Sequence, residues 1–188
     1  MAESAMRLTK EGLALIKSFE GCRLTAYYDG GIDEHGIPHG KLTIGWGHTR
    51  GVFEHDECTQ EAADAWLLED LAEIEGGLLQ CLNGVELNDN QLSALVSFCY
   101  NVGFGKKGKK DGFLVLESGH PSAMYTLLRS GFTIAAADEF PKWSKAGGVE
   151  SAGLLRRRIA EQALYRKEPN PCLRLIKGLN PLRLLKIN

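Results

Sequence analysis

Hydrophobic residues recur at the spacing of an amphipathic helix over much of the chain, with polar residues between them. The clearest of these stretches begin with residues that cap helices, namely Thr9, Thr59 and Asn88, and Asn88 forms a capping-box pattern with Gln91. Gly21 is expected to end the first of these helices, and Gly103 the third. The pattern predicts helices over about 9–21, 59–78, 88–103, 113–117, 122–129, 134–142 and 154–166.

Two shorter stretches follow the period of a β-strand instead. Residues 24–29 and 41–46 are rich in β-forming residues and flank the glycine-rich segment 30–40, which predicts an antiparallel hairpin with a long tip and the one sheet of the protein. In the returning strand Thr43 alternates with Ile44, so its hydroxyl is expected on the face opposite the apolar residues, beside glycines that leave open space. The loop 103–112 is expected to be too glycine-rich and charged to pack.

Composition limits the class of protein. With 188 residues, 44% of them hydrophobic, the chain can bury a sizeable core and is expected to form one domain of one or two lobes. No stretch approaches the roughly 20 apolar residues of a membrane span, and the first ten residues lack the pattern of a secretion signal. The five cysteines are scattered without a paired spacing, so buried thiols are expected rather than a disulfide framework or a zinc ribbon.

The net charge of −2 hides an uneven distribution. Residues 51–105 contain eleven acidic residues and no Lys or Arg, whereas residues 141–188 contain eleven basic residues and three Glu. The basic part would attract an anionic polymer or surface, or the two parts attract each other within one domain. Nucleic acid is not expected as the partner, because no reading motif is present and the aromatic residues do not interleave with the basic cluster.

Two carboxylates and a hydroxyl, those of Glu20, Asp29 and Thr43, form a candidate catalytic set of the kind that glycosidases use. Glu20 follows Ile16 by four residues, which places it on the buried stripe at the end of the first helix. Partial burial and the negative end of the helix dipole favour the neutral acid that a proton donor needs. The alternatives are a frayed helix end for Glu20 and an ordinary turn aspartate for Asp29.

Seven motifs resemble, in order, those of phage-type lysozymes, the endolysins of glycoside hydrolase family 24: FEG at 19–21, AYYD at 26–29, TIGWGHT at 43–49, NQLSALVSF at 90–98, YNVG at 100–103, ADEF at 137–140 and GLLRRR at 153–158. The resemblance covers about residues 7–167. It implies an α+β, lysozyme-like fold that is mainly helical with a small antiparallel β-hairpin lobe. We therefore expect a catalytic domain over 1–168, with the small lobe at about 20–55 and the helical lobe at about 59–168, and a separate tail over 169–188.

The resemblance also implies an activity, hydrolysis of the β-1,4 bond between N-acetylmuramic acid and N-acetylglucosamine in peptidoglycan. By motif position, Glu20 matches the general acid, Asp29 the second carboxylate, and Thr43 the threonine that helps to hold the attacking water. Substrate contacts are expected from Tyr28, Trp46, His48 and Asn101, although His48 fits a structural hydrogen-bonding role as well. No metal or organic cofactor is implied, and a monomer is expected. A lysozyme-like antibacterial effector, a chitinase and a non-catalytic wall-binding module remain alternatives.

The hairpin tip departs from the family pattern, because residues 30–42 separate Asp29 from Thr43. If both strands lengthen together, Thr43 still lies across from Asp29, whereas a register slip by one residue turns it away. The insertion also makes Asp33 a competitor for the role of Asp29.

The same insertion raises the question of a metal site. Asp33 with His35 and His39 would bind a divalent ion if the tip formed a helical turn, but Gly36 and Pro38 disfavour that turn. The expectation is instead a flexible, solvated tip that contacts the glycan or its peptide stems.

The final segment, 169–188, combines leucine and isoleucine with four basic residues and contains no acid. Such a segment suits contact with an anionic membrane or with lipopolysaccharide, or it packs back onto the domain. Because no export signal is recognised, we expect synthesis in the host cytoplasm and action on the cell wall or periplasm after holin-type release.

Overall fold

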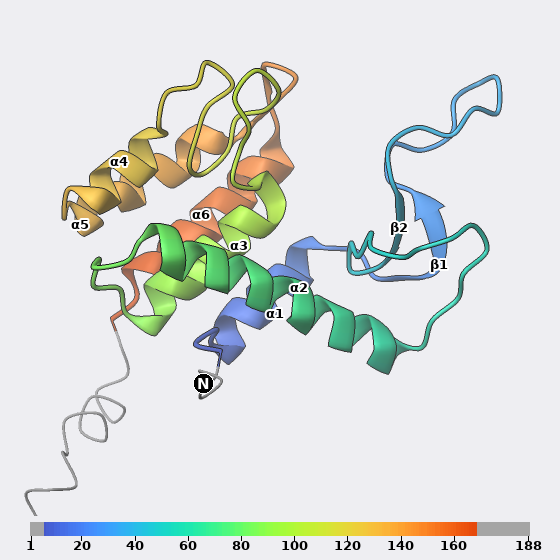
Figure 1. Ribbon diagram of the computed structural model, residues 1–188, viewed down its shortest axis with the longest axis horizontal. Coiled ribbons are helices and arrows are strands. Elements are labelled where there is room, and N and C mark those ends of the chain that lie inside the picture. The colour runs from blue at the N-terminus through green and yellow to red at the C-terminus, as the bar shows by residue number, and fades with distance from the viewer. Residues whose placement is uncertain (1–5, 169–188) are drawn as a thin grey trace, which may run out of the picture.

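The computed structural model describes residues 6–168, which form a mainly helical fold with a small β part at one end (Figure 1). In chain order the elements are α1 (Lys10–Phe19), β1 (Arg23–Tyr28), β2 (Leu42–Gly45), α2 (Gln60–Cys81), α3 (Asp89–Val102), α4 (Ala123–Arg129), α5 (Thr133–Ala136), the 3-10 helix η1 (Ala137–Trp143), β3 (Lys145–Ala146), β4 (Val149–Glu150) and α6 (Ala152–Arg166). The predicted α+β class is confirmed. The tail over 169–188 lies outside the described residues, and so do its predicted contacts.

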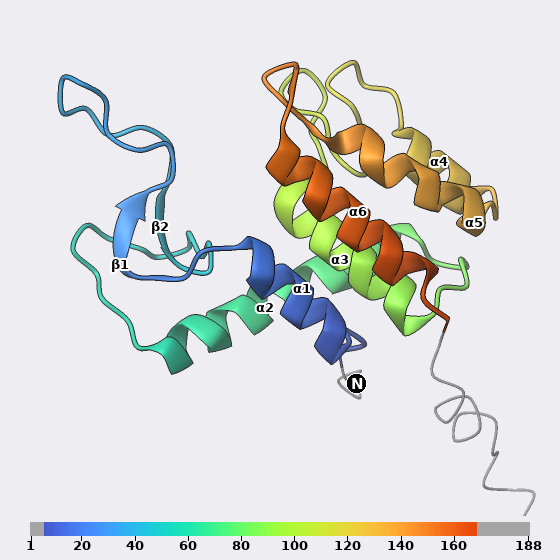
Figure 2. The same cartoon turned by 180° about the vertical axis from the view of Figure 1, so that it is seen from behind.

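Helix α3 is the centre of the core, and α1, α2 and α6 all pack against it (Figure 2). Its N-terminus is fixed by the predicted capping box, in which the Asn88 side chain accepts the Gln91 N–H at 2.9 Å and Gln91 accepts the Asn88 N–H at 2.9 Å. Phe98 is fully buried in the middle of α3, and Phe140 and Trp143 meet it edge-on with ring centroids 5.5 and 5.3 Å away. Burying such a side chain contributes about 1.5–3 kcal/mol, so α3 is where stability is concentrated.

The β1–β2 hairpin stands apart from the helical lobe, and α2 runs between the two parts (Figure 1). Its antiparallel ladder pairs Tyr27 with Thr43 and Tyr28 with Leu42, and the register is irregular between Arg23 and Tyr27. The hairpin is thus the one predicted from the alternating pattern.

The helical lobe departs from prediction in the segment between α3 and α4. The helix predicted over 113–117 is wrong, because the chain there is irregular and Val115 forms an isolated bridge with Pro121. Phe113 is fully buried, with aromatic contacts to Phe104 and Tyr125, so packing overrides the local helical preference. The loop 103–112 was expected not to pack, yet it is tied by backbone hydrogen bonds such as Phe113 N–H to Gly103 O at 2.9 Å.

The second sheet, β3 with β4, was not predicted. Each strand has only two residues, Lys145 pairing with Glu150 and Ala146 with Val149. Two residues are too few to produce a period-2 pattern in the sequence.

The open glycine-lined face expected beside Thr43 is also wrong. Thr43 is 3% exposed and Ile44 is 2% exposed, so both faces of β2 are covered. Gly45 has a φ of +63°, and a Cβ built on it would lie 3.1 Å from the Ala63 side chain of α2. Glycine is needed here for close packing of β2 on α2, which joins the hairpin to the helices.

Among the described residues, the expectations about cysteines and ion pairs are met only in part. Within residues 6–168, no helix is both long and apolar enough to cross a membrane. Cys99 is a buried free thiol as expected, whereas Cys22, Cys58 and Cys81 are free but partly exposed. The acidic segment finds cations near the N-terminus rather than in the basic C-terminal part, since Asp64 pairs with Lys17 at 2.8 Å and Asp70 with Arg50 at 2.8 Å.

Candidate active site

Glu20 lies at the end of α1, where its backbone N–H caps the helix by donating to Ile16 O at 3.1 Å. Its side chain is 24% exposed and its Oε1 accepts a hydrogen bond from Nη1 of Arg157, on α6. The frayed, solvent-facing alternative is therefore wrong. The sequence did not reveal the cation beside Glu20, which makes a charge-assisted hydrogen bond to its carboxyl group.

Arg157 is itself held by a buried network, with a side chain only 4% exposed. Its Nε donates to Glu161 Oε1 at 3.1 Å, and its Nη2 donates to the backbone carbonyl of Ser97 at 3.2 Å. Ser97 Oγ donates to the same Glu161 oxygen at 2.8 Å. Arg157 thus reaches Glu20 from a fixed position on α6 and α3, which makes it a residue that positions the Glu20 carboxyl group.

Arg158 completes the network on the other side of Glu161. Both side chains are fully buried, Nε of Arg158 lies 2.9 Å from Glu161 Oε2, and Nη2 donates to Asn101 Oδ1 at 3.0 Å. The guanidinium also lies 4.9 Å from the centroid of the Phe98 ring. Burial raises the pKa of Glu161 and lowers the pKa of Arg158 to about 10, which shows that desolvation outweighs the attraction between them.

Asp29 follows β1 and turns back toward the base of the hairpin tip. Its Oδ1 accepts the Lys41 N–H at 2.6 Å, and its own N–H donates to Lys41 O at 3.0 Å. Gly40 makes this possible, because a Cβ built there would lie 1.9 Å from Asp29 Oδ1 and its φ is +83°. The enlarged tip therefore closes directly onto the second carboxylate.

Thr43 is not directly across from Asp29. The partner of Thr43 in the ladder is Tyr27, two residues before Asp29, and Asp29 itself lies in the turn after β1. Thr43 Oγ1 donates to Lys41 O at 3.0 Å, which leaves the lone pairs of the hydroxyl for another donor. The one-residue slip that would have turned Thr43 away has not occurred.

Tyr27 is a site residue that the sequence reasoning missed. Burial is the main cause of its raised pKa; Arg23 opposes the shift, and the carboxylates of Asp29 and Glu20 both add to it. The Arg23 guanidinium lies 4.1 Å from the centroid of its ring. The electrostatic surroundings of this phenol thus include both carboxylates, that of Glu20 on α1 and that of Asp29 after β1. The sequence did not mark Tyr27, because the predicted hairpin placed Asp29 rather than Tyr27 opposite Thr43.

Two of the predicted substrate-binding residues, Trp46 and His48, make internal contacts. Trp46 donates to Asp64 Oδ1 at 2.6 Å, and His48 places its two ring nitrogens 2.9 Å from Asp70 Oδ2 and 3.0 Å from Arg50 O. His48 also stacks on Trp66 with centroids 5.2 Å apart. These contacts fit the structural hydrogen-bonding role that the sequence allowed for His48.

Asp64 serves as a junction for that part of the structure. Its Oδ1 accepts hydrogen bonds from Trp46 at 2.6 Å and from Gln60 at 2.8 Å, and its Oδ2 pairs with Lys17 of α1. These donors, Lys17 first, lower the pKa of Asp64 to about 2. The carboxylate therefore stays ionised over most of the acidic range and ties β2, α1 and α2 together.

The other two predicted substrate-binding residues are more accessible. Tyr28 donates from its hydroxyl to Glu54 Oε1 at 2.6 Å and is half-buried. Asn101 is exposed at the end of α3, and its Oδ1 accepts from Arg158, which leaves its amide N–H groups for a ligand. Asn101 is thereby linked through Glu161 and Arg157 to Glu20.

The inserted tip forms an ordered turn around Asp33. Asp33 Oδ1 accepts the N–H groups of His35 and Ile37, each at 2.9 Å, while Oδ2 lies 2.9 Å from His39 Nε2. Asp33 is thus occupied in holding the turn. Among residues 6–168, no group of three or more His, Cys, Asp and Glu side chains is arranged to hold a metal ion.

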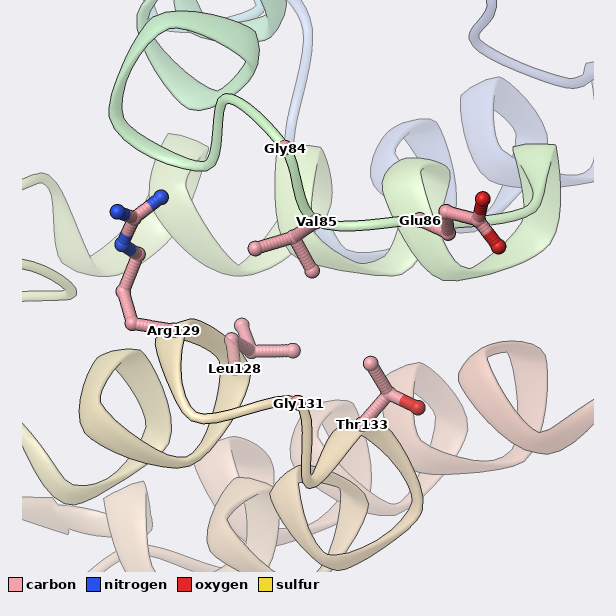
Figure 3. Close-up of a pocket in the computed structure, with 7 residues that line it drawn as sticks. All are labelled: Gly84, Val85, Glu86, Leu128, Arg129, Gly131 and Thr133. Atoms are coloured by element: carbon pink, nitrogen blue, oxygen red, sulfur yellow. The ribbon is translucent and has the colours of Figure 1, made fainter.

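A pocket of about 320 Å³ lies elsewhere, between the loop after α2 and the α4–α5 turn (Figure 3). Val85 and Leu128 face each other across it, and Arg129 and Glu86 stand at opposite ends. Its lining consists of Gly84, Val85, Glu86, Leu128, Arg129, Gly131 and Thr133. None of the predicted catalytic residues belongs to this set, so the pocket is separate from the site around Glu20.

Comparisons with known proteins identify the family of the chain. The model of the Phage lysozyme family matches residues 17–161. The chain is 37% identical to the endolysin of Bacillus phage PZA, over 85% of this chain and 55% of that protein. It is 35% identical to the endolysin of Acyrthosiphon pisum secondary endosymbiont phage 1, over 85% and 98%. The solved muramidase domain of SpmX from Asticaccaulis excentricus superposes with a TM-score of 0.65 at 32% identity, covering 86% of this chain and 98% of that one. This chain therefore belongs to the phage lysozyme family, and its fold is lysozyme-like as predicted.

Proposed function

We propose that this protein is an endolysin-type muramidase that hydrolyses the β-1,4 bond between N-acetylmuramic acid and N-acetylglucosamine in peptidoglycan. The observation that carries the proposal is the pairing of Glu20 with the buried Arg157, together with a hairpin in which Asp29 and Thr43 both bond to the backbone of Lys41. Membership of the phage lysozyme family and the similarity to endolysins and to a muramidase domain support it.

In the proposed reaction Glu20 gives its proton to the glycosidic oxygen as the bond to the anomeric carbon breaks. Arg157 holds the carboxyl in place and stabilises the carboxylate that remains. A water molecule donates one hydrogen bond to Thr43 Oγ1 and attacks the anomeric carbon, and Asp29 takes up its other proton. This is the inverting scheme, which needs room for a water between two carboxyl groups about 6.5–9.5 Å apart. The residues require no metal or organic cofactor for these steps.

The bond that is cleaved gives a direct test of the activity. Purified peptidoglycan is digested, the new reducing ends are reduced with borohydride, and the fragments are identified by mass spectrometry. We expect reduced N-acetylmuramic acid at the new ends. Reduced N-acetylglucosamine would instead identify a different glycosidase, and intact strands would support a wall-binding module.

We also expect Asp29→Ala to damage activity far more than Asp33→Ala. Asp33 is engaged with the backbone and His39 of its own turn, so its loss should change cleavage little. The rate of reducing-end release measures both variants, and the opposite ranking would assign the second carboxylate to Asp33.

Location and partners follow from the proposed activity. Peptidoglycan is the substrate, and we infer synthesis in the host cytoplasm, release by a holin-type lesion, and action as a monomer at the cell wall. The cationic segment 169–188 would then contact anionic membrane or lipopolysaccharide. Co-sedimentation with anionic vesicles, compared with and without this segment, measures that contact.

A further inference from the structure

Four lysines project from one tight turn between α3 and α4, which we call the lysine turn (residues 106–110). Lys106, Lys107, Lys109 and Lys110 are all exposed, and within residues 6–168 none of them forms an ion pair with an acid. The acids of the same loop are Asp111 and Glu117, and Asp111 is occupied with the backbone N–H of Glu117 at 2.6 Å. The turn therefore presents a concentrated positive charge that the protein itself does not neutralise.

The lysine turn is held by its own backbone. Lys106 N–H donates to Lys110 O at 2.8 Å, Lys110 N–H donates back to Lys106 O at 3.0 Å, and Gly108 N–H donates to Glu117 O at 2.7 Å. The loop is anchored in the core by Phe113, which is fully buried. A turn fixed in this way loses little conformational freedom when it binds a ligand, which is a property of binding surfaces rather than of unstructured charged loops.

The position of the lysine turn relates it to the candidate active site. Along α3, Ser97 O accepts from Arg157, Asn101 accepts from Arg158, and the helix ends at Gly103. Lys110 Nζ lies 3.9 Å from the position that a Cβ on Gly103 would take. Six residues of α-helix rise about 9 Å, so Gly103, which Lys110 approaches, lies about 9 Å along α3 from Ser97, the residue whose carbonyl holds Arg157. Figure 1 shows the loop after α3 at the top end of the helical lobe.

We propose that the lysine turn binds the free carboxylates of the peptide stems of peptidoglycan while the glycan strand is held at Glu20. The inference rests on the proposed muramidase function and extends it to the part of the substrate that is not cleaved. Peptide stems leave the glycan at each muramic acid and carry several carboxylates, which match a group of ammonium ions. An anionic lipid surface has the same charge, but the place of the turn on α3 favours a polymer that already occupies the site.

The test combines a protein variant with a chemical change to the substrate. The variant carries Lys106→Gln, Lys107→Gln, Lys109→Gln and Lys110→Gln, and the substrate is peptidoglycan whose carboxylates have been amidated with a carbodiimide and ammonia. Reducing-end release gives kcat/KM for each combination at low salt. We expect the variant to lose about tenfold on native peptidoglycan, the order expected for several screened surface ion pairs. Amidation should lower the wild-type value by a similar factor and leave the variant unchanged.

Two controls separate local charge from other effects. Replacing the same four lysines by arginine keeps the charge and should keep both the rate and its sensitivity to amidation. Replacing Lys10, Lys142, Arg166 and Lys167 by glutamine makes the same change in net charge elsewhere and should also leave the sensitivity in place. Thermal unfolding of each variant confirms that the fold is intact, since the lysine side chains pack against no core residue.

Specific outcomes would overturn the inference. If the variant lost the same factor in kcat/KM on native and on amidated peptidoglycan, the turn would not bind carboxylates. A variant that cleaves like wild type but no longer binds phosphatidylglycerol vesicles would assign the turn to a lipid surface. A wild-type protein that releases no reducing ends would contradict the muramidase function itself, whereas the outcomes above require an active wild-type enzyme.

Discussion

Replacing Glu20 by glutamine is expected to lower the rate of peptidoglycan cleavage by about 1,000-fold or more while the protein remains folded. The amide has nearly the same shape and can still accept a hydrogen bond from Arg157, but it has no proton to give to the leaving oxygen. General acid catalysis typically contributes about 10²–10⁴-fold. Loss of turbidity of a peptidoglycan suspension measures the rate, and thermal unfolding measures the fold.

The matched control is Glu11→Gln, on the same helix. Glu11 is exposed, and Lys167 Nζ lies 3.8 Å from its Oε1, so an amide there removes a carboxylate of α1 without touching the site. Its activity should equal that of the wild type. Full activity in the Glu20 variant, with the fold intact, would remove the proton donor from the mechanism.

Replacing Glu161 by glutamine is expected to reduce the free energy of unfolding by about 3–5 kcal/mol. The carboxylate is fully buried and faces Arg157 and Arg158, so the amide leaves Arg158 desolvated without an opposing charge. For a domain of this size, such a loss corresponds to a fall in Tm of about 6–20 °C. Chemical denaturation gives the free energy directly and should show an unchanged m-value.

Asp138→Asn provides the comparison for that variant. Asp138 of η1 pairs with Arg166, which lies on α6 as Glu161 does. The Asp138 and Arg166 side chains are 63% and 51% exposed. Removing a solvated pair of this kind costs about 0–1 kcal/mol. Arg158→Met combined with Glu161→Leu should recover part of the loss, because neither charge is then left buried alone. A loss at Glu161 no larger than that at Asp138 would show that the network does not carry the stability assigned to it.

The elements that the sequence predicted well are those whose signals are local. The capping residues Thr9, Thr59 and Asn88 lie at the starts of α1, α2 and α3, and the alternating pattern located the β1–β2 hairpin. The segment 113–117 was mistaken for a helix because its apolar residues serve long-range packing of Phe113 instead. The strands β3 and β4 are too short to leave a pattern.

The candidate site was predicted in its residues but not in its contacts. Glu20 was identified by its place at the end of the first helix, yet its partner Arg157 lies 137 residues later in the chain. Arg157 and Glu161 lie four residues apart on α6 and form an ion pair at 3.1 Å, but nothing in the sequence showed that both would be buried against α3. Long-range pairing of charges depends on the packed fold, which residue spacing alone does not encode.

The contact between Gly40 and the Asp29 carboxylate decides how freely the hairpin tip can change over evolution. Between positions 32 and 38 the chain can lengthen or shorten without touching Asp29, because the carboxylate is bonded at the base of the tip and not to its end. Position 40 has no such freedom, since any side chain there would occupy the space of Asp29 Oδ1. The tip can therefore be exchanged as a module among related enzymes, and also by design, provided that the graft returns through glycine.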